Sequence, residues 1–349
     1  MMNKFVLFVF LSFIFCQDLL DRLIVPIYYQ INFSTGYDSN ILLFSERDIE
    51  LKEIGDNSLG KIKYYDSDYY RPTFKIIYSP VLLNEYETNF IFNFQNKFYR
   101  TFNQKNTFST NSKFEIKFGS YHWLKFGYNF SPKNYLRRYQ DLDVFGGKYF
   151  DCLYSYSRGY ISYSIPITKK TWTRVTWKIS NYYYNEHFTE FDTQYNEFNL
   201  YFSNKWNKNV RYSLNLGIGE GNNISYGDGL LSTGHNRSFQ TGNIKISRSR
   251  YNIKVLKLDK FHISFSTDFR NYLSEAIDDP LHSGRFHYDY QIYTSITKKL
   301  NSNYSLNLFI KQRKRNTISG YDWVQDLKSF NKFEVGMKFT YNGIYDIYR

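Results

Sequence analysis

The chain has 349 residues and a formal net charge of +13, and 21% of its residues are aromatic although its mean hydropathy is only −0.55. With six prolines and two cysteines, it is neither a linker-rich, disordered chain nor a disulfide scaffold. A chain so rich in Tyr and Phe yet hydrophilic on average must separate its apolar and polar side chains onto different faces.

Residues 1–16 have the features of a signal peptide. Lys4 provides a positive start, and Phe5 to Phe15 form an apolar stretch too short to cross a bilayer as a helix. We expect cleavage just before Gln17, with acylation of Cys16 as the alternative. Residues 17–26 are then a short lead-in. After cleavage Cys152 is the only cysteine, so we expect no internal disulfide, no cysteine metal site and no cofactor.

Apolar and polar residues alternate from residue 27 to residue 341 with the two-residue period of β-strands. No convincing helical pattern follows residue 26. The alternation recurs about fourteen times, within a range of 12–16, and the even number suits closure of an antiparallel sheet. The expected strands centre on Ile27–Phe33, Phe74–Tyr78, Phe90–Phe94, Phe114–Phe118, Leu124–Phe130, Ile161–Ile165, Val175–Ile179, Phe198–Phe202, Val210–Ile218, Ile244–Ile246, Phe261–Phe269, Tyr288–Ile296, Tyr304–Ile310 and Phe333–Tyr341.

Short and long connections alternate along the chain. Short turns are expected at Leu82–Glu85, Ser120–His122, Pro166–Lys170, Lys205–Asn209 and Lys298–Asn303, and a further turn, which could carry extra residues, near Ser249–Asn252. Long loops are expected at Tyr37–Arg71, Pro132–Phe150, Tyr182–Gln194, Gly221–His235, Asn271–Arg285 and Lys314–Lys328. Short periplasmic turns and long extracellular loops characterise outer-membrane barrels. The sequence therefore predicts an all-β fold, a single antiparallel transmembrane β-barrel at 27–341, with both termini in the periplasm.

The last strand carries alternating apolar residues, Phe333, Val335, Met337, Phe339 and Tyr341, and is followed by a tail at 342–349. It resembles the C-terminal assembly signal of bacterial outer-membrane barrels. This implies recognition by the barrel assembly machinery and residence among outer-membrane lipids of a Gram-negative-type bacterium. The segment Gly36-Tyr37-Asp38-Ser39-Asn40 is also similar to the opening of the barrel in surface lipoprotein assembly modifiers, although their helical-repeat domain is absent.

The polar faces of the strands carry far more basic than acidic residues, so we interpret the net charge as a basic lumen rather than a nucleic-acid surface. The acids on this face are Glu115, Glu197, Asp268, Asp289 and Glu334. The candidate lumen-lining residues are Lys113, Lys117, Lys125, Arg158, Arg174, Lys178, Arg211, Lys245, Arg270, Lys311, Arg313 and Lys338, and Lys75, Lys97 and Lys332 share their face.

Two functions follow from a basic lumen. The first is porin-like passive passage or binding of small anionic or polar solutes. The second is a lumen closed by ion pairs or by the barrel's own loops, which would make the protein a non-conducting scaffold, a surface-binding protein or a secretion component.

Three further sequence patterns bear on metal binding, catalysis and membrane depth. The carboxylates of the Tyr37–Arg71 loop lack EF-hand spacing and alternate with basic residues, which favours a solvated loop over a Ca²⁺ site. His262-Ile263-Ser264 resembles the pairing in outer-membrane phospholipases and lipid A deacylases, but the alternation turns it into the lumen, so we expect no enzyme. Aromatic residues near strand ends predict girdles at headgroup depth, with Tyr99, Trp123, Trp172 and Tyr304 as examples.

Overall fold

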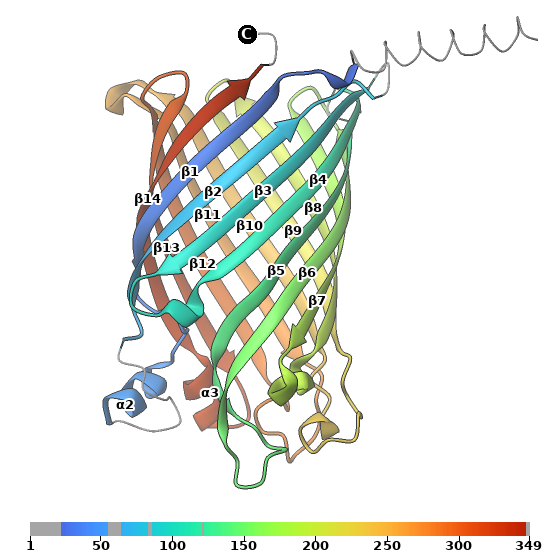
Figure 1. The fold of residues 1–349 in the computed structure, drawn as a ribbon, viewed down its shortest axis with the longest axis vertical. Helices are drawn as coiled ribbons and strands as arrows, with labels where there is room; N and C mark the ends of the chain where they lie inside the picture. The colour runs from blue at the N-terminus through green and yellow to red at the C-terminus, as the bar shows by residue number, and fades with distance from the viewer. Residues whose placement is uncertain (1–21, 55–63, 83–85, 121, 347–349) are drawn as a thin grey trace, which may run out of the picture.

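The computed structural model describes residues 22–54, 64–82, 86–120 and 122–346, and the predicted leader at 1–16 lies outside them. One antiparallel sheet of fourteen strands closes on itself, each strand pairing with its neighbours in sequence and the last with the first. The predicted all-β single barrel is thus confirmed (Figure 1). The strands are β1 (Ile27–Asp38), β2 (Ser67–Tyr78), β3 (Glu87–Tyr99), β4 (Thr107–Gly119), β5 (His122–Gln140), β6 (Tyr149–Pro166), β7 (Thr171–Tyr184), β8 (Thr193–Asn207), β9 (Val210–Asn223), β10 (Phe239–Ile253), β11 (Leu258–Tyr272), β12 (Phe286–Lys299), β13 (Tyr304–Ile318) and β14 (Phe330–Tyr345).

The two faces of the wall differ as the alternation predicts. On β1, Phe33 points outward and is 49% exposed, whereas Asn32 and Ser34 point inward and are 9% and 1% exposed. The same contrast recurs on β11, where Ile263 and Phe265 are exposed outward and Ser264 between them is buried. The barrel therefore shows an apolar outer face and a polar interior, the reverse of a water-soluble domain.

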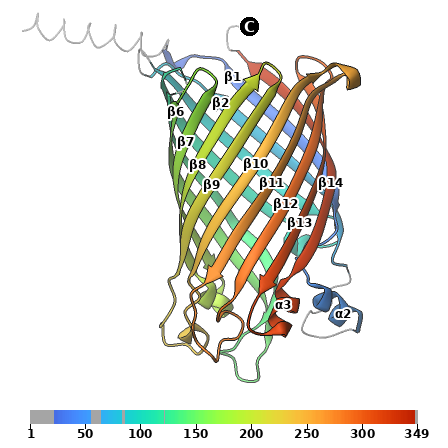
Figure 2. The same ribbon diagram turned by 180° about the vertical axis from the view of Figure 1, so that it is seen from behind.

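The two ends of the barrel are also unlike. Tight connections gather at the end where β14 finishes, at the top of Figures 1 and 2, and the connections that contain α-helices gather at the other end, which we call the mouth. Two short α-helices lie there, α2 (Glu46–Ile54) and α3 (Asp322–Lys328), together with η2 (Asn103–Lys105), η3 (Glu186–Phe191) and η4 (Ser232–Gly234). The expectation of no helix after residue 26 was wrong for these loops. No helix among the described residues is long and apolar enough to cross a membrane.

Strands reach further toward the mouth than the alternation indicates. β5 continues to Gln140, although a loop was expected from Pro132. The alternation did not reveal this part of the strand because register shifts after Ser131 and Tyr135 interrupt the two-residue period. β13 likewise continues to Ile318. The turn expected near Ser249–Asn252 lies at 254–257 instead, where η5 (Lys254–Leu256) joins β10 to β11.

The closing strand also exceeds its predicted limit at residue 341. β14 runs to Tyr345, where it pairs with Ile27 of β1, so four residues of the expected tail at 342–349 belong to the barrel. Main-chain hydrogen bonds maintain this pairing even though Asn342 and Gly343 break the apolar alternation.

Three of the four aromatic residues named for the girdles point into the barrel. Tyr304 is outward and 37% exposed, but Tyr99 is 7% exposed and belongs to an interior cluster. Trp123 lies under the Lys125 ammonium group at 4.9 Å, and Trp172 lies 5.0 Å from the Arg174 guanidinium, so both share the inward face. The prediction was wrong for these three because proximity to a strand end does not determine which face a residue occupies.

Candidate functional site

The twelve candidate basic residues all lie on strands, at positions that alternate with outward apolar residues. Four of them pair with carboxylates: Lys117 with Glu87 at 2.8 Å, Lys125 with Glu115 at 2.9 Å, Lys178 with Glu197 at 3.2 Å and Arg313 with Asp289 at 2.9 Å. These pairs neutralise part of the lumen charge.

The remaining eight have no carboxylate within 4.0 Å among the described residues. Arg158 donates from Nε to Ser180 Oγ at 2.9 Å, and Arg174 donates from Nε to Ser164 Oγ at 3.0 Å. Neutral hydroxyl acceptors leave the cationic charge uncompensated, so this wall keeps an excess of positive charge. The eight are Lys113, Arg158, Arg174, Arg211, Lys245, Arg270, Lys311 and Lys338.

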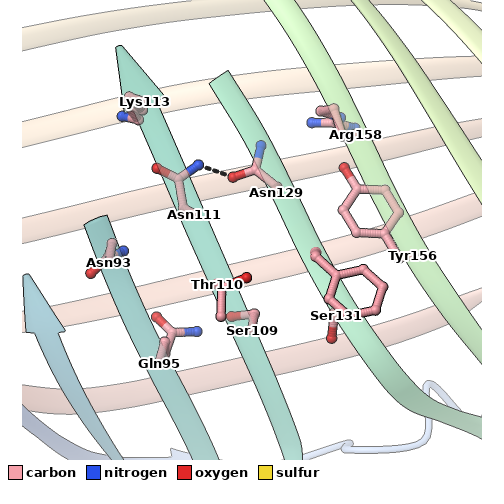
Figure 3. A pocket seen from close by; sticks show the side chains of 11 residues that line it. Asn93, Gln95, Ser109, Thr110, Asn111, Lys113, Asn129, Ser131, Tyr156 and Arg158 are labelled. Atoms are coloured by element: carbon pink, nitrogen blue, oxygen red, sulfur yellow. Dashed lines mark hydrogen bonds between the residues drawn. The ribbon is translucent and has the colours of Figure 1, made fainter. Parts of the chain in front are cut away.

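A polar cavity of about 460 Å³ lies against strands β3 to β6. Figure 3 shows Lys113 and Arg158 beside a row of amide side chains, in which Asn111 donates a hydrogen bond to Asn129. Two cations and no carboxylate line this cavity. Its chemistry suits a small solute that carries negative charge or hydrogen-bond acceptors.

The first mouth connection packs against wall residues at the mouth. We call residues 39–54 the plug segment. Its side chains Ile41, Leu42 and Phe44 are at most 3% exposed and pack against inward aromatic residues of the wall. Those wall residues are Tyr69, Tyr99, Tyr135 and Phe309. The apolar contacts hold this connection against the wall, and the sequence did not predict them.

Polar contacts start helix α2 within the plug segment. The Asp48 backbone N–H donates to Ser45 Oγ at 3.0 Å, and the Ser45 N–H donates to Asp48 Oδ2 at 3.0 Å. This reciprocal pair is a capping box. The spacing Ser45-x-x-Asp48 is therefore a sequence signal for the start of α2, and the expectation of a solvated loop did not take it into account.

One ion pair fastens the plug segment to the wall, and a group of buried polar contacts around Asp38 of β1 lies where the segment begins, with the Asn40 N–H donating to Asp38 Oδ1 at 3.2 Å. Asp38, at the base of the segment, is 0% exposed and accepts from Lys332 Nζ at 2.7 Å and from Tyr99 Oη at 3.2 Å, while Lys97 Nζ lies 3.8 Å away. Arg137 Nη1 on β5 donates to Asp48 Oδ2 at 2.9 Å. Removal of one partner from such a pair leaves a buried charge uncompensated.

Four basic residues of the mouth were not predicted as lumen-lining residues, because they fall in segments expected to be loops. These are Arg137, Arg285, Arg315 and Lys328. Arg315 was the most accessible to prediction, since it continues the alternation of Lys311 and Arg313, and it pairs with Asp289 at 2.6 Å. Lys328 ends α3, and burial near Arg137 and Arg285 lowers the pKa of its ammonium group to about 7.

Glu190 of η3 predicts a pH dependence of the mouth loops. Burial raises its pKa from 4.5 to about 7, more than the nearby Arg237 lowers it, and its Oε2 atom has no hydrogen-bond partner. Because folding then favours the protonated form, its contribution to stability is full below pH 4.5 and is lost as the pH rises through about 7. We expect hydrogen exchange of residues 185–192 to accelerate over this range.

Two variants separate the effect of Glu190 ionisation from a general opening of the loop. Glu190→Gln should slow exchange above the pKa of Glu190 and remove that part of the pH dependence. Glu186→Gln, whose side chain is 89% exposed in the same loop, should behave as the wild type. An unchanged pH profile in Glu190→Gln would refute the assignment.

The His-x-Ser pattern does not form a nucleophile pair in the structure. His262 lies on the inward face of β11, and its Nδ1 is 2.9 Å from Ser249 Oγ on β10, the neighbouring strand. Among the described residues, no group of three or more His, Cys, Asp or Glu side chains could hold a metal ion.

No family model matches the chain, and no curated protein matches it. Similar solved structures include the outer membrane channel DcaP of Acinetobacter baumannii, 10% identical with a TM-score of 0.47 over 91% of this chain and 96% of that one. OmpT, an outer membrane protein of Vibrio cholerae, is 7% identical with a TM-score of 0.45 over 90% and 97%. An anion-selective porin from Comamonas acidovorans is 11% identical with a TM-score of 0.40 over 90% and 98%. At these identities the likeness concerns the fold alone. The strand pairing itself shows that the chain is a closed, antiparallel β-barrel of fourteen strands, an architecture consistent with an outer-membrane β-barrel protein.

Proposed function

We propose that the protein is a porin-like barrel of a bacterial outer membrane, through which small anionic or polar solutes pass or in which they bind. The observation that carries the proposal is the set of eight inward cations without a carboxylate within 4.0 Å among the described residues. Fixed positive charges along a narrow, low-dielectric wall raise the local concentration of anions.

The outer face supports the membrane part of the proposal. Side chains such as Phe126, Trp177 and Ile218 are 40%, 50% and 68% exposed, and a bilayer would cover them. In this orientation the tight turns and both termini face the periplasm and the mouth faces outward. The outward residues Phe333, Val335, Met337, Phe339 and Tyr341 of β14 would then serve the barrel assembly machinery as the assembly signal.

The plug segment favours one alternative, a non-conducting barrel that acts as a scaffold, binds a partner through its loops or takes part in secretion. Its buried apolar residues pack against the wall at the mouth, and the pair of Asp48 with Arg137 holds it there. A conducting barrel needs a path beside this segment, so conductance decides between the two functions.

We expect the refolded protein in a planar bilayer to give steady, anion-selective current steps. Arg158→Gln with Arg174→Gln should lower the anion-to-cation permeability ratio by roughly a factor of two or more, because two uncompensated charges leave the wall. Arg248→Gln is the control, since Arg248 lies on the outward face of β10 with Ile244 and Ile246. Selectivity is read from the reversal potential in a salt gradient.

Each outcome has a defined meaning. Silence from a folded, heat-modifiable barrel would reject passage and support the non-conducting alternative. Equal selectivity in the double variant and the wild type would reject the lumen charge as its cause.

A further inference from the structure

Tyr272, at the mouth end of β11, lies between two arginines. The guanidinium carbon of Arg285 is 3.9 Å from the centre of the Tyr272 ring, and Arg270 Nη1 is 3.4 Å from Tyr272 Oη. The Arg270 guanidinium also lies 4.2 Å from the Phe239 ring. The guanidinium groups of Arg270 and Arg285 thus lie against aromatic rings. The hydrogen bond from Arg270 to Tyr272 is long and weak, and most N–H donors of the two side chains have no acceptor among the described residues.

A third cation comes from α3. Lys328, at the end of α3, lies within electrostatic range of Arg285 and Tyr272, and also of Arg137 and Asp48. Its Nζ lies 5.8 Å from the Tyr139 ring. We call Arg270, Arg285 and Lys328 the arginine–lysine cluster.

The nearby carboxylates are engaged elsewhere. Asp289 accepts from Arg313 and Arg315, and Asp48 accepts from Arg137. Among the described residues, no carboxylate lies within 4.0 Å of any member of the cluster. Two guanidinium groups and the Lys328 amine, whose pKa burial lowers to about 7, therefore lie near one another with no carboxylate within 4.0 Å among the described residues. An anion bound there would favour the protonated form of Lys328.

Arg285 adds an independent observation. The residue is only 4% exposed, and its Nε donor is buried without a hydrogen-bond partner. A buried guanidinium N–H without an acceptor is costly, and an acceptor that binds there would remove the cost. Arg270 and Lys328 are only partly buried, unlike Arg285.

We propose that the arginine–lysine cluster is a binding site for a small tetrahedral oxyanion such as phosphate. Guanidinium groups present parallel N–H donors that match the oxygens of such an anion, and the ammonium group supplies a third charge. The inference rests on the proposed function in that the anion enters through the lumen. It goes further by assigning one site and one ligand class.

The test is isothermal titration of the full, refolded protein in detergent with inorganic phosphate. We expect saturable binding by the wild type. Arg285→Gln and Lys328→Gln should each weaken it about tenfold, the effect of losing one charged hydrogen bond. Arg248→Gln, on the outer face, should leave it unchanged. If Arg285→Gln fails to fold, Lys328→Gln still tests the site, because Lys328 lies at the end of a short loop helix.

Sulfate and chloride define the ligand class. Sulfate should compete with phosphate because it shares the tetrahedral oxygens, and chloride at the same ionic strength should compete poorly. Absence of phosphate binding, or equal binding by both variants and the wild type, would overturn the site. Equilibrium binding does not require conduction, so a silent barrel that binds phosphate would reject the proposed pore and retain this site, and a conducting barrel that does not bind would do the reverse.

Discussion

Asp38→Asn is expected to detach the plug segment from the mouth of the barrel. Asp38 is fully buried and joins Lys332, Lys97 and Tyr99 at the base of the segment. Asparagine keeps the shape but removes the charge, so Lys332 and Lys97 lose the carboxylate that lies within 4.0 Å of them, at a cost of up to about 3–5 kcal/mol. The apolar contacts of Ile41 and Phe44 alone would then hold the segment.

Two measurements check this expectation. Limited trypsin digestion should cleave Asp38→Asn faster than the wild type at Arg47 and Lys52, which lie in the plug segment. If the barrel conducts, its current steps should also grow because the mouth widens. Glu87→Gln is the matched control, since its pair with Lys117 is half exposed and contributes about 1 kcal/mol or less. Unchanged digestion of Asp38→Asn would show that the ion pairs do not hold the segment.

Gly36→Val is expected to prevent closure of the barrel in a large fraction of molecules. Gly36 on β1 pairs with Gly336 on β14 in the seam that joins the two ends of the sheet. A Cβ atom at Gly36 would lie 2.4 Å from Val335 O and 2.9 Å from Gly336 Cα. Both neighbours are main-chain atoms, so the strands must separate to make room, at a cost of about 1–3 kcal/mol or more.

The fraction of heat-modifiable protein after refolding and the urea midpoint of unfolding both report this effect. Gly159→Val is the matched control, because Gly159 also lies within a strand, β6, but a Cβ there meets nothing within 4 Å. Equal refolding yields and midpoints for the two variants would contradict a close approach at the seam.

Several features of the mouth could not be predicted because they depend on contacts between distant parts of the chain. Lys328 was assigned to a long loop, but α3 carries it within electrostatic range of Arg137 on β5 and of Arg285, which precedes β12. Trp123 and Trp172 were assigned to the outer girdle, but cation contacts with Lys125 and Arg174 place them inside. The bulges of β5 concealed Arg137 because they shift the alternation.

The sequence by itself determined the closed barrel, its fourteen strands and the face on which most of their residues lie. Alternation is a local property: each strand separates apolar from polar side chains within a few residues, whatever the distant chain does. Only the tertiary structure decided where the first mouth connection packs and which cations remain unpaired. The buried cluster that contains Phe44, Tyr69 and Phe309, and the pairing of Asp38 with Lys332, join residues that meet only after the sheet has closed. Burial and charge compensation at the mouth therefore follow from closure, which no local pattern records.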